Sequence, residues 1–497
     1  MSTLLVTRFA PSPTGSLHLG NARTAFFSHL WARKSAGRFI LRIEDTDVER
    51  NREEWVGGIE SALEWLQMAP DEGPFRQSAQ DERHRVAIDA LFEAGFLYAC
   101  DCTREEIAER TKDNPTPGYD GYCRERHLER GPTTALRFKT PPEGSTTVVD
   151  LIRGEIVFPH SAMDDFVAVK STGQPLFALA NVIDDRDMGI THVIRGEDLL
   201  PTTPRQLLLW AALDEAGEGE AGWGERTQLP VFAHLPMLVD ERGKKLSKRK
   251  DPVAVEDYRD KGYLPEAFRN YLALLGWSPK GDAEIVPVET LIEQFRLEDV
   301  HHAPAFFDVK KFTHMNGVYI RELPVEEFIE RSKPWVAPEL GEWTPSTAGP
   351  PWPAERFDAD TFARLAPLVQ ERVATLGEVP AMVDFIFLAD PPYDEAQFDS
   401  VIVRDEGAVD ILDGAVAVYS HCEWRAADLH DLTLEMAERL GKKLGKAQAP
   451  IRVAVTGRKV GPPLFEALEV LGRDEVLRRL QAALALRAAR VGTGPPG

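Results

Sequence analysis

The first 45 residues constrain the fold of this chain most strongly. Residues 4–10 (LLVTRFA) have the composition of a buried strand, and the apolar spacing of residues 21–36 predicts a helix that Gly37 ends. Residues 38–45 (RFILRIED) predict a second buried strand. A helical crossover between two strands makes their pairing parallel. This is half of a nucleotide-binding α/β sheet, whose ligands bind at the carboxyl ends of the strands.

The loop between the first strand and the helix contains Gly15 and Gly20, spaced as in a phosphate-binding loop. Asn21 and Ala22 follow where that motif has lysine and a hydroxyl residue. What remains is a helix N-terminus that can hold a phosphate, with His18 as a donor and Gly20 allowing close approach to the backbone. The alternative is a tight turn that carries a surface histidine.

A second segment, KKLSKRK at residues 244–250, is a compact basic loop in a chain with a net charge of −22. It is either a solvated run of charge or a lid whose lysines meet the negative charge of a transferring phosphoryl group. A histidine–glycine helix start followed far downstream by K-L-S-K resembles the two signatures of the class I aminoacyl-tRNA synthetases. Each half is a weak signal, and the ordered pair is a specific one.

Further segments narrow the resemblance to the bacterial glutamyl-tRNA synthetases: RFAPSPTGSLHLG, RIEDTD, GYDGYC, THVIRGED, KLSKR, GYLPEAFRNYLALLGWS and IRVAVTGRKVGPPLFEAL. The related glutaminyl enzymes are expected to have PEPNG and RFDDTN at the first two places. The resemblance covers nearly the whole chain. It implies that glutamate and ATP, supplied with Mg2+, give glutamyl-adenylate and pyrophosphate, and that the glutamyl group then passes to tRNA. The first step is expected to need bound tRNA.

The resemblance also implies the site residues. Glutamate is expected to contact Arg8, Ala10, Ser12, Glu44, Phe177, Asn181 and Arg195. ATP is expected to contact His18, Gly20, Asp198, Leu238, Lys245, Leu246, Ser247, Lys248 and Arg249. The catalytic residues would be His18, Gly20, Lys245 and Lys248, with Lys248 making the largest contribution to transition-state charge. No side chain acts as a nucleophile, so catalysis is expected to be positioning and electrostatics.

These assignments agree with the chemistry of the residue types. A guanidinium pairs with a carboxylate through two hydrogen bonds and finds only half a partner in an amide, so Arg8 and Arg195 would select glutamate over glutamine. Glu44 can accept from the substrate ammonium. Phe177 departs from the family, which usually has tyrosine there. The missing hydroxyl removes a hydrogen bond of about 0.5–1.5 kcal/mol, which predicts weaker glutamate binding or an altered orientation without a change of specificity.

Three of the four cysteines, Cys100, Cys102 and Cys123, lie close together in the sequence. In a chain expected to be cytoplasmic, such a cluster indicates a metal site before disulfides. Three thiolates and one more donor suit a structural, tetrahedral Zn2+. The fourth ligand is expected to be Tyr119, whose spacing resembles the shortened paralogue glutamyl-queuosine tRNA(Asp) synthetase, with His127 and Glu125 as alternatives. Three thiols without metal are the remaining possibility.

The expected fold is a Rossmann-like α/β catalytic domain with an inserted zinc-type α+β domain for the tRNA acceptor end, followed by all-α anticodon-binding domains. The predicted ranges are residues 1–92 with 181–237 for the catalytic domain, 93–180 for the insertion, 238–322 for the KLSKR loop and stem-contact region, and 323–395 and 396–497 for two helical subdomains. No apolar run is long enough for a membrane span. We expect a cytoplasmic monomer.

The tRNA partner is predicted from the length and charge of the C-terminal part. The shortened paralogue lacks these residues. Residues 441–497 carry eleven Lys/Arg against four Asp/Glu. This excess indicates either contact with tRNA phosphates or only a basic surface on a packed helical tail. tRNA(Glu) is the expected substrate. Additional charging of tRNA(Gln) stays open, and a catalytically inactive tRNA-binding scaffold would instead have lost His18, Gly20, Lys245 and Lys248.

Overall fold

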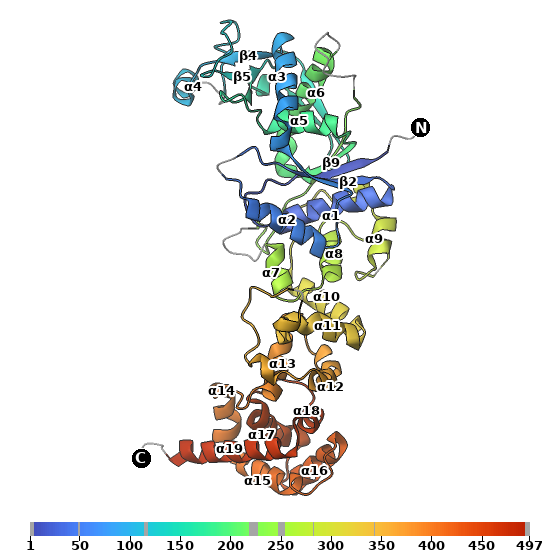
Figure 1. The fold of residues 1–497 in the computed structure, drawn as a ribbon, viewed down its shortest axis with the longest axis vertical. Helices are drawn as coiled ribbons and strands as arrows, with labels where there is room; N and C mark the ends of the chain where they lie inside the picture. The colour runs from blue at the N-terminus through green and yellow to red at the C-terminus, as the bar shows by residue number, and fades with distance from the viewer. Residues whose placement is uncertain are drawn as a thin grey trace. The chain divides into compact units, whose positions relative to one another are not determined.

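The computed structural model describes residues 4–47, 50–113, 118–217, 227–246, 254–281, 283–341 and 343–492. Its chain forms two compact units (Figure 1). The first comprises Met1–Asp257 and Phe268–Val309, and the second comprises Tyr258–Ala267 and Lys310–Gly497. The five predicted domain ranges divide the chain more finely than these two units, and they stay predictions.

A seven-stranded sheet forms the centre of the first unit. Its order is β3 (Glu72–Arg76), β2 (Arg38–Ile43), β1 (Val6–Phe9), β9 (His192–Gly196), β10 (Val231–Leu235), β6 (Ser145–Asp150) and β7 (Gly154–Pro159). All neighbouring pairs are parallel except the β6–β7 hairpin. The predicted parallel pairing of the first two strands is confirmed, with Val6 opposite Arg38.

Helices cover both faces of this sheet. Figure 1 shows α1 (Leu19–Lys34) and α2 (Glu53–Trp65) on one side of the strands, and α3 (Asp81–Glu93), α5 (Phe177–Asp187) and α6 (Thr203–Gly217) on the other. The sequence placed the start of α1 at residue 21, two residues too late. The reason is that His18, and not a residue of the usual capping types, caps the helix by accepting from the Asn21 N–H group.

The end of α1 also differs from the prediction. The residue with positive φ is Ala36, at +49°, so Gly37 does not end the helix through a left-handed conformation. Gly37 is needed for space, because a Cβ atom there would lie 2.3 Å from the Leu5 carbonyl oxygen. The absence of a side chain therefore lets the end of the helix pass close to the start of β1.

The cysteine-containing segment folds onto a small antiparallel sheet of β4 (Leu97–Cys100), β5 (Ala135–Phe138) and β8 (Val167–Val169), with α4 (Arg104–Thr111) beside it. Strands β6 and β7 lie inside the range predicted for the insertion, yet β6 pairs with β10 in the central sheet. The stretch 93–180 thus contributes strands to two sheets.

The remaining elements of the first unit follow the central sheet. They are the parallel pair β11 (Leu238–Val239) and β12 (Ala305–Phe306), most of α8 (Pro265–Leu274), α9 (Val288–Gln294) and the 3-10 turns η1 (Gln77–Gln80), η2 (His160–Ala162), η3 (Glu197–Thr202) and η4 (Leu297–Asp299). The chain passes between the units within α7 (Val255–Asp260), within α8 and again after Val309.

The second unit contains helices and no strand among its described residues, as predicted. It contains α10 (Val309–Glu322), α11 (Val325–Val336), α12 (Ala359–Gln370), α13 (Val379–Phe387), α14 (Glu395–Phe398), α15 (Ala408–Tyr419), α16 (Ala426–Arg439), α17 (Leu444–Thr456), α18 (Leu464–Leu471) and α19 (Arg473–Gly492). The buried side chains of α15, α16, α17 and α19 share one core, which includes Tyr419. In the part of the chain that the structure describes, no helix combines the length and the apolar character that a membrane crossing needs.

Candidate active site

One cavity of about 550 Å3 opens where β1, β2, β9 and β10 reach their carboxyl ends. Every described residue predicted to contact glutamate or ATP lines it: Arg8, Ala10, Ser12, His18, Gly20, Glu44, Phe177, Asn181, Arg195, Asp198, Leu238, Lys245 and Leu246. Ser247, Lys248 and Arg249 lie outside the described residues. The structure therefore brings the two predicted sets together, while their individual roles stay predictions.

A buried ion network holds Arg8, which lines the cavity, from behind. Arg8 donates to both carboxylate oxygens of Asp185, from Nε at 3.1 Å and from Nη2 at 3.3 Å, and Arg42 donates from Nη1 to Oδ1 at 2.7 Å. Burial alone would raise the pKa of Asp185, but the charges of Arg8 and Arg42 outweigh it and hold that pKa below its usual range. The charge of Arg8 is thus already paired within the protein.

Arg195 is held in a different way, by neutral side chains. Its Nε donates to Nε2 of His234 at 3.0 Å, and its Nη2 donates to Thr203 Oγ1 at 2.9 Å and to Gln206 Oε1 at 2.7 Å. His234 in turn contacts Asp150, with 2.6 Å between Nδ1 and Oδ2. Burial, together with the nearby charge of Arg8, lowers the pKa of Arg195 to about 9.

Glu44 follows β2 and is buried between Asn181 and Arg42. Asn181 Nδ2 donates to Oε1 of Glu44 at 2.7 Å, and Arg42 Nη2 lies 3.5 Å from the same oxygen. Arg42 also donates to Asn181 Oδ1 at 3.0 Å, which fixes the orientation of the amide. Burial raises the pKa of Glu44. Among the described residues, none donates to Oε2, so this oxygen can accept from a ligand cation.

Phe177 begins α5 and lies one helical turn before Asn181, so both side chains are on the same face of the helix. Phe177 lines the cavity and is 36% exposed. Its ring can contact a ligand but offers no hydrogen bond.

The opposite part of the cavity contains the start of α1. Because the Asn21 N–H group donates to Nδ1 of His18 at 3.3 Å, the imidazole proton is carried on Nε2, which acts as a donor. A Cβ atom on Gly20 would lie 3.3 Å from the His18 ring, so the glycine gives the imidazole its room. The first turn of α1 has no acidic side chain, and its free N–H groups favour an anionic ligand.

A tight turn brings the beginning of the basic loop to the cavity. The chain reverses after β11 with Gly243 at φ +71°, where the Gly243 N–H group donates to the Asp240 carbonyl at 2.9 Å. Lys245 then forms a bridge with Val239, and its Nζ lies 3.5 Å from Oδ2 of Asp198. Two residues predicted to contact ATP are therefore adjacent.

Several residues of these networks were not predicted as site residues, namely Arg42, Asp185, His234 and Asp150. The available signal was the presence of charged residues inside buried elements: Arg42 in the strand RFILRI, and Asp184 with Asp185 in the helix FALANVIDDRD. Charged groups are rarely fully buried unless they are paired. His234 gave no comparable signal.

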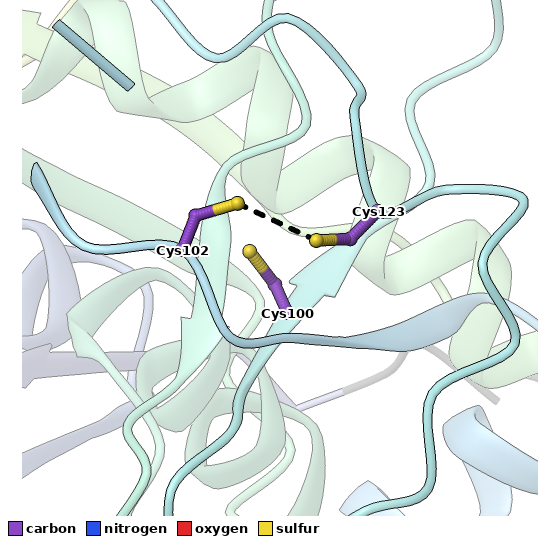
Figure 2. A group of neighbouring side chains, drawn as sticks. All are labelled: Cys100, Cys102 and Cys123. Carbon is purple, nitrogen blue, oxygen red and sulfur yellow. Dashed lines mark hydrogen bonds between the residues drawn. The ribbon is translucent and has the colours of Figure 1, made fainter. Parts of the chain in front are cut away.

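Figure 2 shows the side chains of Cys100, Cys102 and Cys123 pointing toward one another. Their sulfur atoms all lie within 4.8 Å of one another, and Sγ of Cys102 is 3.5 Å from Sγ of Cys123. Zinc–sulfur bonds of about 2.3 Å in a tetrahedron place sulfur atoms roughly 3.8 Å apart. The three cysteines therefore fit Zn2+.

The position of Tyr119 fits a fourth ligand. Its hydroxyl oxygen is 3.5 Å from Sγ of Cys100 and accepts from the Cys123 N–H group at 2.7 Å. A shared tetrahedral zinc would place oxygen and sulfur about 3.5 Å apart. His127 and Glu125 are not among the residues grouped with the thiols, and the Glu125 carboxylate is 3.6 Å from Nζ of Lys139.

An arginine donates to each of the three sulfur atoms. The pairs are Arg137 Nε to Cys100 at 3.2 Å, Arg110 Nη2 to Cys102 at 3.4 Å, and Arg126 Nη1 to Cys123 at 3.2 Å. Three thiolates around Zn2+ carry a net charge of −1. Arg110 and Arg126 are also paired with Asp120 and Asp101, so Arg137 is the one of the three without a carboxylate partner among the described residues, and its charge offsets that of the thiolates. The charge around the cluster thus suits a thiolate-rich metal site.

Comparisons with known proteins agree with this architecture. Residues 4–314 match the family described as "tRNA synthetases class I (E and Q), catalytic domain", and residues 327–484 match "Anticodon binding domain". The described part of the first match contains the cavity and the cysteine group, and the second lies in the helical unit.

Similar proteins span nearly the whole chain. The glutamate–tRNA ligase of Frankia alni is 53% identical over 96% of this chain and 97% of its own length, and that of Thermobifida fusca is 51% identical over 97% and 98%. A crystal structure of a glutamate tRNA ligase from Elizabethkingia meningosepticum, in complex with its amino acid, has a TM-score of 0.80 at 30% identity, covering 97% of this chain and 99% of that one. This chain is a member of the glutamate–tRNA ligase family, within the class I tRNA synthetases.

Proposed function

We propose that this chain attaches L-glutamate to tRNA(Glu), using ATP with Mg2+ and passing through glutamyl-adenylate. One observation carries the proposal. A single cavity combines two arginines and a carboxylate, suited to an acidic amino acid, with a helix start and a lysine suited to phosphates. Membership of the glutamate–tRNA ligase family supports the same activity.

At the amino-acid end, Arg8 and Arg195 would receive the side-chain carboxylate of glutamate. Neither guanidinium uses Nη1 in a hydrogen bond with a described residue. The ligand ammonium would bind the open oxygen of Glu44, and the added positive charge would favour the ionised carboxylate. Ala10 and Ser12 line the path from this end toward the nucleotide.

At the nucleotide end, the start of α1 and His18 would hold the phosphates of ATP, with Lys245 and Asp198 nearby. Leu238 and Leu246 add apolar surface for the nucleoside. Lys248 keeps the role predicted from the sequence. These groups would stabilise the charge that develops as pyrophosphate departs.

The reaction balances without a protein nucleophile. The α-carboxylate of glutamate attacks the α-phosphorus of ATP, and pyrophosphate takes the electrons of the broken P–O bond. A hydroxyl of the terminal adenosine of tRNA then attacks the activated carbonyl carbon and displaces AMP, and the hydroxyl proton passes to the departing phosphate or to water. The protein's contribution is to orient both substrates and to stabilise charge.

We further propose that Cys100, Cys102, Cys123 and Tyr119 bind a structural Zn2+. The separations of their sulfur and oxygen atoms support this assignment. The ion would fix the loop between β4 and β5, in the segment predicted to receive the tRNA acceptor end.

The helical unit would bind the anticodon arm. The excess of basic residues near the C-terminus supports this only in part, because several pair with carboxylates of the same unit: Arg458 with Asp384, Arg478 with Asp390 and Glu475, Arg479 with Glu475, and Arg490 with Glu395. Lys443 and Lys446, before and within α17, are exposed and make no ion pair with a described residue. They are the more suitable phosphate contacts.

The test is aminoacylation by the purified full-length protein with radiolabelled glutamate or glutamine and ATP with Mg2+. The acceptors are tRNA(Glu), tRNA(Gln) and queuosine-modified tRNA(Asp). Glutamate on tRNA(Glu) alone is the expected result. Glutamate on tRNA(Gln) as well would show a non-discriminating enzyme, which nothing in the comparisons favours. Binding of tRNA without any charging would refute the proposal and support an inactive derivative.

A further inference from the structure

We propose that His234, fixed by Asp150, is the positioning residue that orients Arg195 toward the side-chain carboxylate of glutamate. The proposal rests on the proposed function and adds a residue pair that was predicted neither from the sequence nor from the resemblance. It concerns how the protein keeps a buried arginine both rigid and available to a ligand.

Adjacent strands bring the three residues together. His234 on β10 is directly opposite Arg195 on β9, and Asp150 ends β6, which is the neighbour of β10 on its other side. His234 is fully buried, and Arg195 and Asp150 are nearly so. Their arrangement is therefore set by strand register and not by a flexible loop.

The hydrogen bonds determine where the imidazole proton lies. The Asp150 carboxylate accepts from the His234 N–H group at 3.0 Å, and from the N–H groups of Ile152 at 2.9 Å and Arg153 at 2.8 Å. An ionised carboxylate only accepts, so the His234 Nδ1, 2.6 Å away, carries the proton. The Nε2 atom is then an acceptor, as the Nε–H group of Arg195 requires at 3.0 Å.

The imidazole separates the carboxylate from the guanidinium. If Asp150 paired directly with Arg195, it would offset part of the guanidinium charge within the protein, as Asp185 does for Arg8. His234 instead supplies a neutral acceptor, because burial lowers its pKa. Thr203 and Gln206 are neutral acceptors as well. Arg195 thus keeps an unpaired charge that a ligand carboxylate completes.

The arrangement also fixes one edge of the guanidinium. Nε and Nη2 are both engaged with the protein, which leaves Nη1 as the nitrogen without a described partner. A rigid donor loses less entropy on binding and favours a single ligand geometry. Weakening the His234 contact should therefore affect glutamate more than any other substrate.

Two substitutions at position 234 separate this role from packing. His234→Asn retains an amide near Nδ1, able to contact Asp150, but removes the acceptor for Arg195. His234→Gln places an amide oxygen near the position of Nε2 and restores the acceptor. The matched control is His192→Gln, a half-buried histidine on β9 that contacts Thr191 and does not line the cavity.

The experiment measures aminoacylation of tRNA(Glu) with glutamate or ATP as the varied substrate. We expect His234→Asn to raise the KM for glutamate roughly ten- to a hundredfold, with the KM for ATP unchanged. We expect His234→Gln to recover much of this loss and His192→Gln to resemble the parent. Equal increases in both KM values, or no recovery by His234→Gln, would overturn the proposal.

The parent protein provides a second test, which reads the tautomer of the ring directly and does not depend on activity. Imidazole nitrogen NMR of 15N-histidine-labelled protein should show a buried neutral ring with its proton on Nδ1 whose signal is absent from His234→Gln. His29 and His160, whose contacts also place a proton on Nδ1, should keep their signals in that variant. The opposite tautomer, with the proton on Nε2, would refute the role of His234. If the parent charges no tRNA with glutamate, the proposed function itself fails, and that outcome is distinct from an unchanged KM in His234→Asn.

Discussion

The cavity and the cysteine group (Cys100, Cys102 and Cys123) both consist of polar or thiol side chains held close together, but the chain brings these side chains together in different ways. The polar residues that line the cavity include members of β1, α1, α5, β9 and η3 and the residue after β2, which are widely separated in the sequence. The cysteine group comes from one stretch that leaves β4 and returns through a loop before β5. The cavity depends on the register of the sheet, and the cysteine group depends on a local loop.

Substitutions in the cavity and in the cysteine group should therefore have different effects. A change in the cavity should alter glutamate recognition or the stability of the sheet, without altering metal content. A change in the cysteine group should alter metal content and tRNA binding, without altering the affinity for glutamate. Within the cavity, the paired Arg8 and the unpaired Arg195 should differ again, since only Arg195 lacks a protein carboxylate as its direct partner.

The largest effect is expected from Arg195→Gln. The substitution removes up to two charge-assisted hydrogen bonds to the substrate carboxylate, each worth about 1.5–3 kcal/mol. We expect kcat/KM for glutamate to fall roughly 10²- to 10⁴-fold, measured by aminoacylation of tRNA(Glu). Arg205→Gln, at a more exposed arginine of α6 that is paired with Asp164, is the control. An unchanged kcat/KM in Arg195→Gln would show that the cavity does not select the substrate.

Asp185→Asn should act mainly on stability. It removes the negative charge shared by Arg8 and Arg42, which are both buried, and an uncompensated buried charge costs about 3–5 kcal/mol. We expect the free energy of unfolding of the first unit, measured with urea at neutral pH, to fall by that amount. Asp187→Asn is the matched control on α5, because Asp187 pairs with Arg83 at the surface. Equal effects of the two substitutions would contradict the role of the buried network.

The ion pairs of Asp185 also predict how stability depends on pH. The pKa of Asp185 is lowered in the folded protein, so the unfolded chain binds a proton more readily. The stabilisation is complete above the ordinary aspartate pKa of about 3.9 and is lost as the pH falls through the lowered value. The difference between the parent and Asp185→Asn should therefore shrink in acid, as measured by urea unfolding across pH.

Tyr119→Phe tests the fourth ligand of the cysteine group. Removing the hydroxyl should weaken zinc binding at least about tenfold, measured by metal analysis after dialysis and by competition with a chelator. The KM for tRNA should rise while the KM for glutamate stays at the parent value. His127→Ala is the matched control and should retain zinc. The reverse result, with zinc lost from His127→Ala and kept by Tyr119→Phe, would assign the ligand to His127.

Much of the fold could be predicted because local patterns decide it. The apolar runs of residues 4–10 and 38–45, joined by a helix, required a parallel pair, and the structure has one. The placement of β6 beside β10 was not predicted. Nothing in the alternation of the residues in β6 indicates which sheet they join, because strand partners distant in sequence leave no periodic signal.

The same distinction between local patterns and distant contacts applies to the candidate site. Residues that would contact the substrates could be assigned because they fall within the motifs of the family, and the described ones line one cavity. The groups that hold them could not be assigned. Asp150 and His234 contact each other only because β6 and β10 are neighbouring strands, and Arg195 lies on the next strand, β9. Arg42 and Asp185 contact each other only because β2 lies against α5.

The smallest effect is expected at Phe177, which lines the cavity without a polar atom. Phe177→Tyr would add a hydroxyl on the face of α5 that also carries Asn181, and one net hydrogen bond is worth about 0.5–1.5 kcal/mol. We expect the KM for glutamate to fall about two- to tenfold, with the preference over glutamine unchanged because both arginines remain. The measurement is aminoacylation of tRNA(Glu) with glutamate as the varied substrate.

The control for this last substitution is Phe306→Tyr, at an exposed phenylalanine of β12 that does not line the cavity. It adds the same hydroxyl where no substrate is expected, so its KM for glutamate should equal that of the parent. If Phe177→Tyr also leaves the KM unchanged, the ring at this position serves only as apolar surface, and the two guanidinium groups and Glu44 bind glutamate without its help.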